Sequence, residues 1–313
     1  MFVKTETDMR SEVILELKGA DIGYQSPLIE DANAFLKSGE VTLLTGDNGT
    51  GKSTLIRTIL GQQKLLAGEI FLDGKNKSLL TAADIAHKIA VVFSRSTVPA
   101  HYTVTDLISL GRFIHYPYYF RLNEKDKRFV KEVIERLQLQ DLRNTPLQQL
   151  SDGNLQKAYI GRAIVQDTPI IILDEPTTHL DDINKQRILN LLYDLATLDA
   201  KAILFSSHDK APAIRISHHA WTIKNGSLQS ALPEDLSAHN LDTVPKNVQR
   251  LPTVNASDFD RQLLYGALQK QIGQDLSNFH ISRQSDFWLL KRDHLEYQFS
   301  NISALIAFLK ENI

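Results

Sequence analysis

Residues 46–54 read GDNGTGKST. The apolar run at residues 41–44 precedes this stretch as a buried strand would, and the apolar spacing beyond Lys52 is helical. A phosphate-binding loop requires this order of strand, glycine-rich loop and helix, because the glycines let backbone N–H groups turn toward phosphate oxygens. The N-terminus of the helix adds partial positive charge. The stretch therefore predicts a site for a nucleoside triphosphate.

Two side chains of this loop have a specific chemical task. Lys52 can reach the β- and γ-phosphates, and the hydroxyl of Ser53 can ligate Mg²⁺. The alternative, a glycine-rich turn that binds nothing, is disfavoured by the strand and the helix on either side. The residues expected to hold the nucleotide are Gly46, Asp47, Asn48, Gly49, Thr50, Gly51, Lys52, Ser53 and Thr54.

Composition excludes several classes of protein. The 313 residues include 35 Lys+Arg and 37 Asp+Glu, so the net charge of -2 argues against a general nucleic-acid binder. The chain has no cysteine, which excludes disulfides, thiolate catalysis and cysteine-ligated metals. No apolar run approaches the roughly 20 residues that span a bilayer, and the first residues are too polar for a secretory signal. We expect a cytoplasmic protein.

The order of elements predicts an α/β fold with a helical insertion. Strands and helices alternate through most of the chain, whereas residues 103–161 are mostly helical. Residues 13–17 alternate as an edge strand would, and residues 69–74 read as a strand followed by an Asp-Gly turn. Thr103 and Asp106 predict a capping box that opens a helix.

A second motif, IIILDEP at residues 170–176, supplies carboxylates. A buried strand that ends in two acids places them at the C-terminal edge of the sheet, where α/β proteins bind ligands. Asp174 would hold Mg²⁺, and Glu175 would accept a proton from the water that attacks the γ-phosphate. By itself the motif is also compatible with a solvated strand end; its pairing with the phosphate loop favours the catalytic interpretation.

Further segments carry a family resemblance. Residues 150–156 read LSDGNLQ and open a helix, residues 178–181 read THLD, residues 205–209 read FSSHD, and Tyr24 follows a glycine. They match the signature, the D-loop, the switch histidine and the adenine-stacking aromatic of the ABC-transporter ATPase family, in order and spacing. The chain resembles that family from about residue 12 to residue 230.

The resemblance implies an architecture and an assembly. It implies a P-loop NTPase (RecA-like) core with an antiparallel β edge subdomain and a helical insertion. It places the ABC ATPase domain at residues 1–230, with the helical subdomain at about 97–165. In this family two such domains face each other head to tail around two ATP molecules, each with Mg²⁺. Because this chain carries one domain, a homodimer is the simplest assembly.

The resemblance also assigns roles to single residues. Ser151 and Gly153 would donate hydrogen bonds to the γ-phosphate that Lys52 of the other subunit holds, as a hydroxyl and an N–H at a helix start can do. His208 would contact the same phosphate from its own subunit and help to hold Glu175 and the attacking water. The other residues expected in these roles are Asp152 and Asn154 of the signature, Asp181 of the D-loop, and Tyr24 beside adenine.

Two positions depart from the family pattern. The family has a glutamine, a ligand of Mg²⁺ or water, where this chain has Ser94, whose hydroxyl reaches less far. In the signature, Asp152 and Asn154 replace the residues that the family has at these two positions. The serine hydroxyl and Gly153 remain, so we expect contact with the γ-phosphate to persist. With Lys52, Asp174, Glu175 and His208 in place, we expect an active ATPase.

Residues 103–112 resemble the insertion of importers for iron-siderophores, haem and cobalamin. This implies the ATP-hydrolysing subunit of an importer, with two transmembrane permease subunits, an indirect periplasmic or lipoprotein substrate-binding protein, and no nucleic acid as partners. The protein would lie peripherally on the cytoplasmic face of the cell (inner) membrane. The aromatic residues within 113–120 could contact a membrane partner or pack internally. A soluble ABC-type ATPase and an ATP-gated interaction switch are the alternatives.

Residues 231–313 lie beyond the region that resembles the ABC ATPases. A polar, proline-punctuated linker precedes an amphipathic helix at about 259–268. Residues 278–290 predict two paired strands, residues 295–299 a third, and residues 302–309 a closing helix. This regular apolar content predicts a folded accessory domain with a docking, dimer-stabilising or regulatory role.

Overall fold

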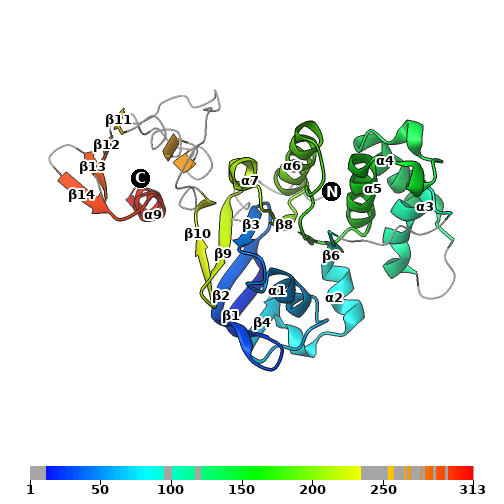
Figure 1. Ribbon diagram of the computed structural model, residues 1–313, viewed down its shortest axis with the longest axis horizontal. Helices are drawn as coiled ribbons and strands as arrows, with labels where there is room; N and C mark the ends of the chain where they lie inside the picture. The colour runs from blue at the N-terminus through cyan, green and yellow to red at the C-terminus, as the bar shows by residue number, and fades with distance from the viewer. Residues whose placement is uncertain are drawn as a thin grey trace, which may run out of the picture. The chain divides into compact units, whose positions relative to one another are not determined.

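The computed structural model is shown in Figure 1. It describes residues 12–94, 101–116, 121–233, 253–256, 264–265, 267–268, 276, 279–284, 287–292 and 295–312. Contacts divide the chain into two units, which consist of Met1–His208 with Trp221–Gln229, and of Asp209–Ala220 with Ser230–Ile313. The accessory domain that we expect from residue 231 stays a prediction.

The larger of two sheets has ten strands in the order β5-β4-β1-β2-β10-β9-β3-β8-β7-β6. Strands β3, β8, β7 and β6 are parallel neighbours. The strands are β1 (Val13–Gly23), β2 (Pro27–Lys37), β3 (Val41–Gly46), β4 (Ala67–Leu72), β5 (Lys75–Asn76), β6 (Ile89–Val92), β7 (Ile170–Leu173), β8 (Ala202–Ser206), β9 (His219–Lys224) and β10 (Ser227–Ala231).

The parallel strands bring the sequence motifs to one edge of the sheet. Strands β7 and β8 are buried along their whole length, as their continuous apolar sequences require. Because parallel strands point the same way, their C-terminal ends lie together. The chain leaves this edge at Gly46 toward the phosphate loop, at Leu173 toward Asp174, and at Ser206 toward His208.

The antiparallel part of the sheet corrects one expectation. Strand β1 pairs with β2 on one side and with β4 on the other, so the expected edge strand at residues 13–17 is an interior strand. Leu15 and Leu17 are buried because a strand covered on both edges also packs one face on the core. The turn between β4 and β5 is confirmed, with Asp73 at φ 54° and Gly74 at φ 71°.

The helices of the first unit include the expected helical insertion. The capping box at Thr103 and Asp106 is confirmed at the start of α3. Helices α3, α4 and α5 pack on one another (Figure 1). The helices are α1 (Lys52–Ile59), α2 (Ala82–Lys88), α3 (Val104–Ser109), α4 (Glu124–Arg136), α5 (Asp152–Val165) and α6 (Asp182–Thr197), with short 3-10 helices at Lys77–Leu79, Leu110–His115, Gln140–Leu142 and Leu147–Gln149.

Helix α5 joins this helical cluster to the sheet. Arg162 Nη2 donates to the carbonyl oxygen of Val91 in β6 at 3.2 Å. One turn later, Gln166 Nε2 donates to the carbonyl oxygens of Ala86 at 2.8 Å and Ile89 at 3.2 Å. The helix that begins at the signature therefore ends on the strand that leads to Ser94.

The second unit has its own core. Besides α7 (Lys210–Ile216), it contains a four-stranded sheet in the order β11-β12-β13-β14 and a closing helix. The expected hairpin, third strand and helix are confirmed, whereas parallel β11 was not anticipated. Residues 117–120 of the aromatic stretch and much of the expected helix at 259–268 lie outside the described residues. The elements are β11 (Thr253–Asn255), β12 (His280–Arg283), β13 (Trp288–Arg292), β14 (Leu295–Phe299) and α9 (Ile302–Asn312).

Candidate active site

The phosphate loop lies between β3 and α1. A Cβ on Gly46 would lie 2.8 Å from Thr50 Oγ1 and 2.9 Å from the carbonyl oxygen of Ile223, so this position needs glycine. Lys52 is 7% exposed, and its Nζ donates to the carbonyl oxygens of Gly46 at 2.7 Å and Asp47 at 3.0 Å. The lysine therefore lies along the loop, where phosphate oxygens can replace the carbonyl acceptors.

The N-terminus of α1 has no competing anionic side chain of its own. Gly51, the N-cap, has φ 108° and supplies no side-chain hydrogen bond, and the first turn of α1 contains no acidic residue. The unpaired N–H groups of that turn and the helix dipole remain available to an anion. The loop and the helix together are suited to bind phosphate groups.

A hydrogen-bond network joins the ends of β7 and β8. Ser53 Oγ donates to Asp174 Oδ2 at 3.1 Å, and Ser206 Oγ donates to Asp174 Oδ1 at 2.8 Å. Ser206 Oγ also accepts the backbone N–H of Glu175 at 2.8 Å. Asp174 and Ser206 are both buried. The network orients the Asp174 carboxylate toward Ser53. Ser206 lies within the motif at residues 205–209, but sequence reasoning assigned it no role.

Ser53 and Asp174 fit a Mg²⁺ site. Mg²⁺ is bound in nucleotide enzymes by one or two protein oxygens, waters and the phosphates of the substrate. The hydroxyl and carboxylate beside the phosphate loop are hard oxygen donors of that kind. Within the described part of the chain, no cluster of three or more His, Cys, Asp or Glu could hold a metal by itself. The donor set therefore suits an ion that arrives with phosphate oxygens.

Glu175 is held by two neighbours in an uncommon backbone conformation. Its φ is 53°, a left-handed value that non-glycine residues rarely adopt and that is concentrated at functional sites. His208 Nε2 lies 2.5 Å from Oε1, and Thr178 Oγ1 donates to Oε2 at 3.2 Å. Each carboxylate oxygen thus has one partner, and the two contacts hold the carboxylate in place.

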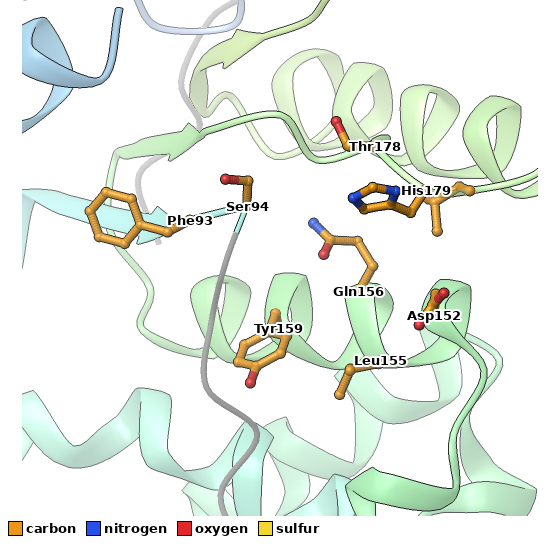
Figure 2. Close-up of a pocket in the computed structure, with 9 residues that line it drawn as sticks. Phe93, Ser94, Asp152, Leu155, Gln156, Tyr159, Thr178 and His179 are labelled. Atoms are coloured by element: carbon orange, nitrogen blue, oxygen red, sulfur yellow. The ribbon is translucent and has the colours of Figure 1, made fainter.

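Ser94 lies at a small polar pocket instead of within this network. It follows β6, whose Val92 accepts the backbone N–H of Asp174 at 2.8 Å. The pocket has a volume of about 160 Å³ and contains Ser94, Gln156, Thr178 and His179. Figure 2 shows the Gln156 amide projecting between Ser94 and the other two side chains. No hydrogen bond joins Ser94 to Ser53 or Asp174 among the described residues, so its role at Mg²⁺ stays a prediction.

The signature lies against Asn184, a residue of α6 that is hydrogen-bonded to Asp181 of the D-loop. Ser151 caps α5 by accepting the N–H of Asn154 at 3.4 Å. A Cβ on Gly153 would lie 2.9 Å from Asn184 Cγ. Asn184 also donates its backbone N–H and its side-chain amide to Asp181, at 2.7 and 2.8 Å. The backbone hydrogen bond of Asn184 is the largest cause of a lowered pKa at Asp181. Asn184, which sequence reasoning missed, therefore links the two helix starts.

Within one chain, the candidate residues form two groups. Lys52, Ser53, Asp174, Glu175 and His208 belong to the phosphate-loop edge, and the hydrogen bonds described above for them do not involve residues 151–154. Tyr24 is 55% exposed, so its ring is accessible to a base. The roles assigned to all these residues stay predictions.

Comparison with known proteins identifies the family. The ABC transporter family profile matches residues 29–178. Iron(3+)-hydroxamate import ATP-binding protein FhuC of Bacillus subtilis (strain 168) is 36% identical over 208 residues, which are 66% of this chain and 77% of that protein. The chain belongs to the ABC transporter family. Another family member, petrobactin import ATP-binding protein FpuC of Bacillus anthracis, is 33% identical over 214 residues, 68% of this chain and 79% of that protein.

Solved structures of ABC cassettes have the same fold. CbiO1 from Clostridium perfringens, part of an ABC transporter complex, has a TM-score of 0.65 and 25% identity, with 72% of this chain and 90% of that chain covered. A dimeric ATP-binding cassette in a post-hydrolysis state, bound to ADP and Pi, has a TM-score of 0.62 and 25% identity, with 70% and 99% covered. The predicted P-loop NTPase core is confirmed, and the protein is an ABC-type ATPase that binds ATP.

Ser206→Ala is expected to weaken both folding and turnover. The substitution leaves the partly buried N–H of Glu175 without its acceptor and the buried carboxylate of Asp174 without one donor. An unsatisfied buried polar group costs about 1–3 kcal/mol, so we expect a loss of that size in the free energy of unfolding together with slower ATP hydrolysis. Urea unfolding and phosphate release measure the two effects. Ser227→Ala, at an exposed position of β10, is the control; equal stability of the two variants would contradict the prediction.

Proposed function

We propose that the protein is the ATP-hydrolysing subunit of an importer for an iron chelate of the siderophore type. The pairing of Glu175 with His208 at the edge of the phosphate loop carries the enzymatic part of the proposal. The names of the relatives, which import iron(3+)-hydroxamate and petrobactin, support the cargo class. They favour this function over a soluble ABC ATPase or an interaction switch, and over haem or cobalamin as cargo.

In the proposed reaction Glu175 is the general base. The attacking water gives its proton to the carboxylate while the backbone of the loop and Lys52 hold the phosphates. Thr178 and His208 keep the carboxylate oriented, so little reorganisation is needed when charge develops. Mg²⁺, held by Ser53 and Asp174, would neutralise charge on the β- and γ-phosphates. Tyr24 would stack on adenine, and the hydroxyl of Ser94 would contact water at the metal.

The signature residues would complete the site of a second copy. Ser151, Asp152, Gly153 and Asn154 lie at the start of α5, where N–H groups and a hydroxyl can face a phosphate. Among the described residues, Gly153 lies against Asn184 and Ser151 accepts the N–H of Asn154, and no hydrogen bond joins either residue to the phosphate loop; this supports a role in trans. Two copies would thus bind two ATP molecules head to tail, with Asp181 in the D-loop of each chain.

The partners follow from the proposed function. Two permease subunits would change conformation together with the ATPase dimer. A periplasmic or lipoprotein binding protein would deliver the cargo to them. Within the described residues, no helix is long and apolar enough to cross a bilayer. We therefore place the protein peripherally on the cytoplasmic face of the cell (inner) membrane, attached through the permease and without a nucleic-acid partner.

Uptake of radiolabelled iron by cells tests this function. In a strain that lacks the gene, we expect uptake of an iron(3+)-siderophore to fall to background, and the wild-type gene to restore it. The Glu175→Gln gene should fail to restore it although the protein accumulates. Uptake of inorganic iron by a separate route is the control. Normal uptake of hydroxamate and catecholate siderophores in the deletion strain would refute the proposed cargo.

A further inference from the structure

A second polar hollow lies between helices α5 and α6, away from the phosphate loop. Its volume is about 220 Å³. Three cationic side chains contribute to its wall, against one carboxylate. Its polar lining consists of Arg136, Lys157, Arg187, Gln138, Asn190 and Asp194. The formal excess of positive charge in this wall indicates a site for an anion.

Lys157 is the unusual member of this wall. It is 8% exposed, and no hydrogen bond or ion pair engages it among the described residues. Burial lowers the pKa of its ammonium, and the positive charge of Arg187 lowers it further. Its ammonium is partly desolvated at the wall of the hollow, and native proteins commonly pair such charges. The lysine therefore lacks a counter-ion within the described chain.

The carboxylate in the hollow does not supply that counter-ion. Asp194 lies seven residues after Arg187 on α6, which is roughly 10 Å along the helix. No ion pair joins Asp194 to Arg187 or Lys157 among the described residues. Arg136 is already paired, with its Nη1 2.5 Å from Asp199 Oδ2. Among the described residues, neither Lys157 nor Arg187 forms an ion pair, although the charge of Arg187 also acts on the Asp181 carboxylate.

The remaining polar groups also favour an oxygen-rich anion. Gln186 Nε2 donates to Asn190 Oδ1 at 2.8 Å, which leaves the amide N–H₂ of Asn190 as a donor. An ammonium, a guanidinium and an amide thus surround the hollow, and all of them donate. We propose that it binds a phosphate-type oxyanion between Lys157 and Arg187. The anion would link α5, which begins at the signature, to α6, which begins after Asp181.

Thermal unfolding of the full chain in phosphate tests this site. Mg²⁺ and ADP are kept saturating so that the nucleotide loop is filled, and sodium phosphate is compared with sodium chloride at equal ionic strength. Ligand that binds only the folded state raises the melting temperature with its concentration. We expect Lys157→Met to weaken the apparent phosphate affinity about 10-fold or more, since a hydrogen bond to a charged group is lost. Arg187→Gln, a surface substitution that does not threaten folding, should weaken it similarly.

The matched control is Lys185→Met, which removes one positive charge from α6 outside the hollow and should leave the phosphate response unchanged. In chloride, Lys157→Met should be at least as stable as the wild type, because it removes a partly desolvated charge that has no ion-pair partner within the described chain; phosphate should shrink or reverse this difference. An identical phosphate response in the wild type, Lys157→Met and Arg187→Gln would overturn the proposal. So would an equal loss of stability of Lys157→Met in both salts, which would mark Lys157 as a purely structural residue.

Discussion

Glu175→Gln is expected to lower the rate of ATP hydrolysis by roughly 10²–10⁴-fold while ATP binding is retained. The amide cannot accept the proton of the attacking water. It keeps the shape of the carboxylate and can still hydrogen-bond to Thr178 and His208. Because the phosphate loop is unchanged, binding should persist. Phosphate release under saturating ATP measures the rate, and a fluorescent ATP analogue measures the affinity.

The same variant should also accumulate as an ATP-bound dimer. If residues 151–154 of one chain contact the γ-phosphate in the other, blocked hydrolysis keeps that contact in place. Size-exclusion chromatography with ATP and Mg²⁺, compared with ADP, detects the dimer. Glu135→Gln, at an exposed position of α4, is the control and should behave like the wild type. Hydrolysis at the wild-type rate by Glu175→Gln would show that another group is the base.

Lys52→Met is expected to weaken ATP binding by roughly 10- to 100-fold and to remove hydrolysis as a consequence. The Lys52 ammonium is the buried cation of the phosphate loop, and each hydrogen bond from it to a phosphate contributes about 1.5–3 kcal/mol. Methionine has a similar length without charge, so the loop should still fold. Equilibrium titration with a fluorescent ATP analogue at constant Mg²⁺ gives the change in Kd.

Two comparisons make the result on Lys52 specific. Lys64→Met, at an exposed position after α1, removes the same charge outside the site and should leave the Kd unchanged. Glu175→Gln, unlike Lys52→Met, should retain its affinity for the ATP analogue. An unchanged Kd in Lys52→Met would show that the lysine does not contact the nucleotide, and would contradict the role that we assign to the loop.

Much of the fold and of the candidate site could be predicted because its signals are local. The loop at residues 46–54 needs glycines at fixed spacing, and the motif at 170–176 needs a buried strand before its acids. Both requirements are met within a few residues of chain. The capping box at Thr103 and Asp106 and the turn at Asp73 are local in the same way, and the structure confirms them.

The missed features depend on contacts between distant segments. Apolar and polar residues alternate at 13–17, but this pattern does not tell how many strands pair with the segment. In the structure, β4 pairs with the edge that we expected to be unpaired. Thr178 belongs to the D-loop motif but has no role assigned to it there, and Asn184 lies outside the motif. They matter because Thr178 bonds to Glu175, and Asn184 fills the space over Gly153.

The sequence by itself determined the family of this protein: a phosphate loop, two acids after a strand, and segments that resemble the signature and the switch-histidine motif, hence an ABC ATPase. Only the tertiary structure decided how these groups are held. Because β8 pairs with β7, Ser206 donates a hydrogen bond to Asp174, from which it is 32 residues away in the chain. Likewise Lys157 of α5 and Arg187 of α6 line one hollow, although they lie 30 residues apart in the chain. The order of residues states which side chains are present, but a hydrogen bond such as that between Ser206 and Asp174 forms only when folding brings distant residues together.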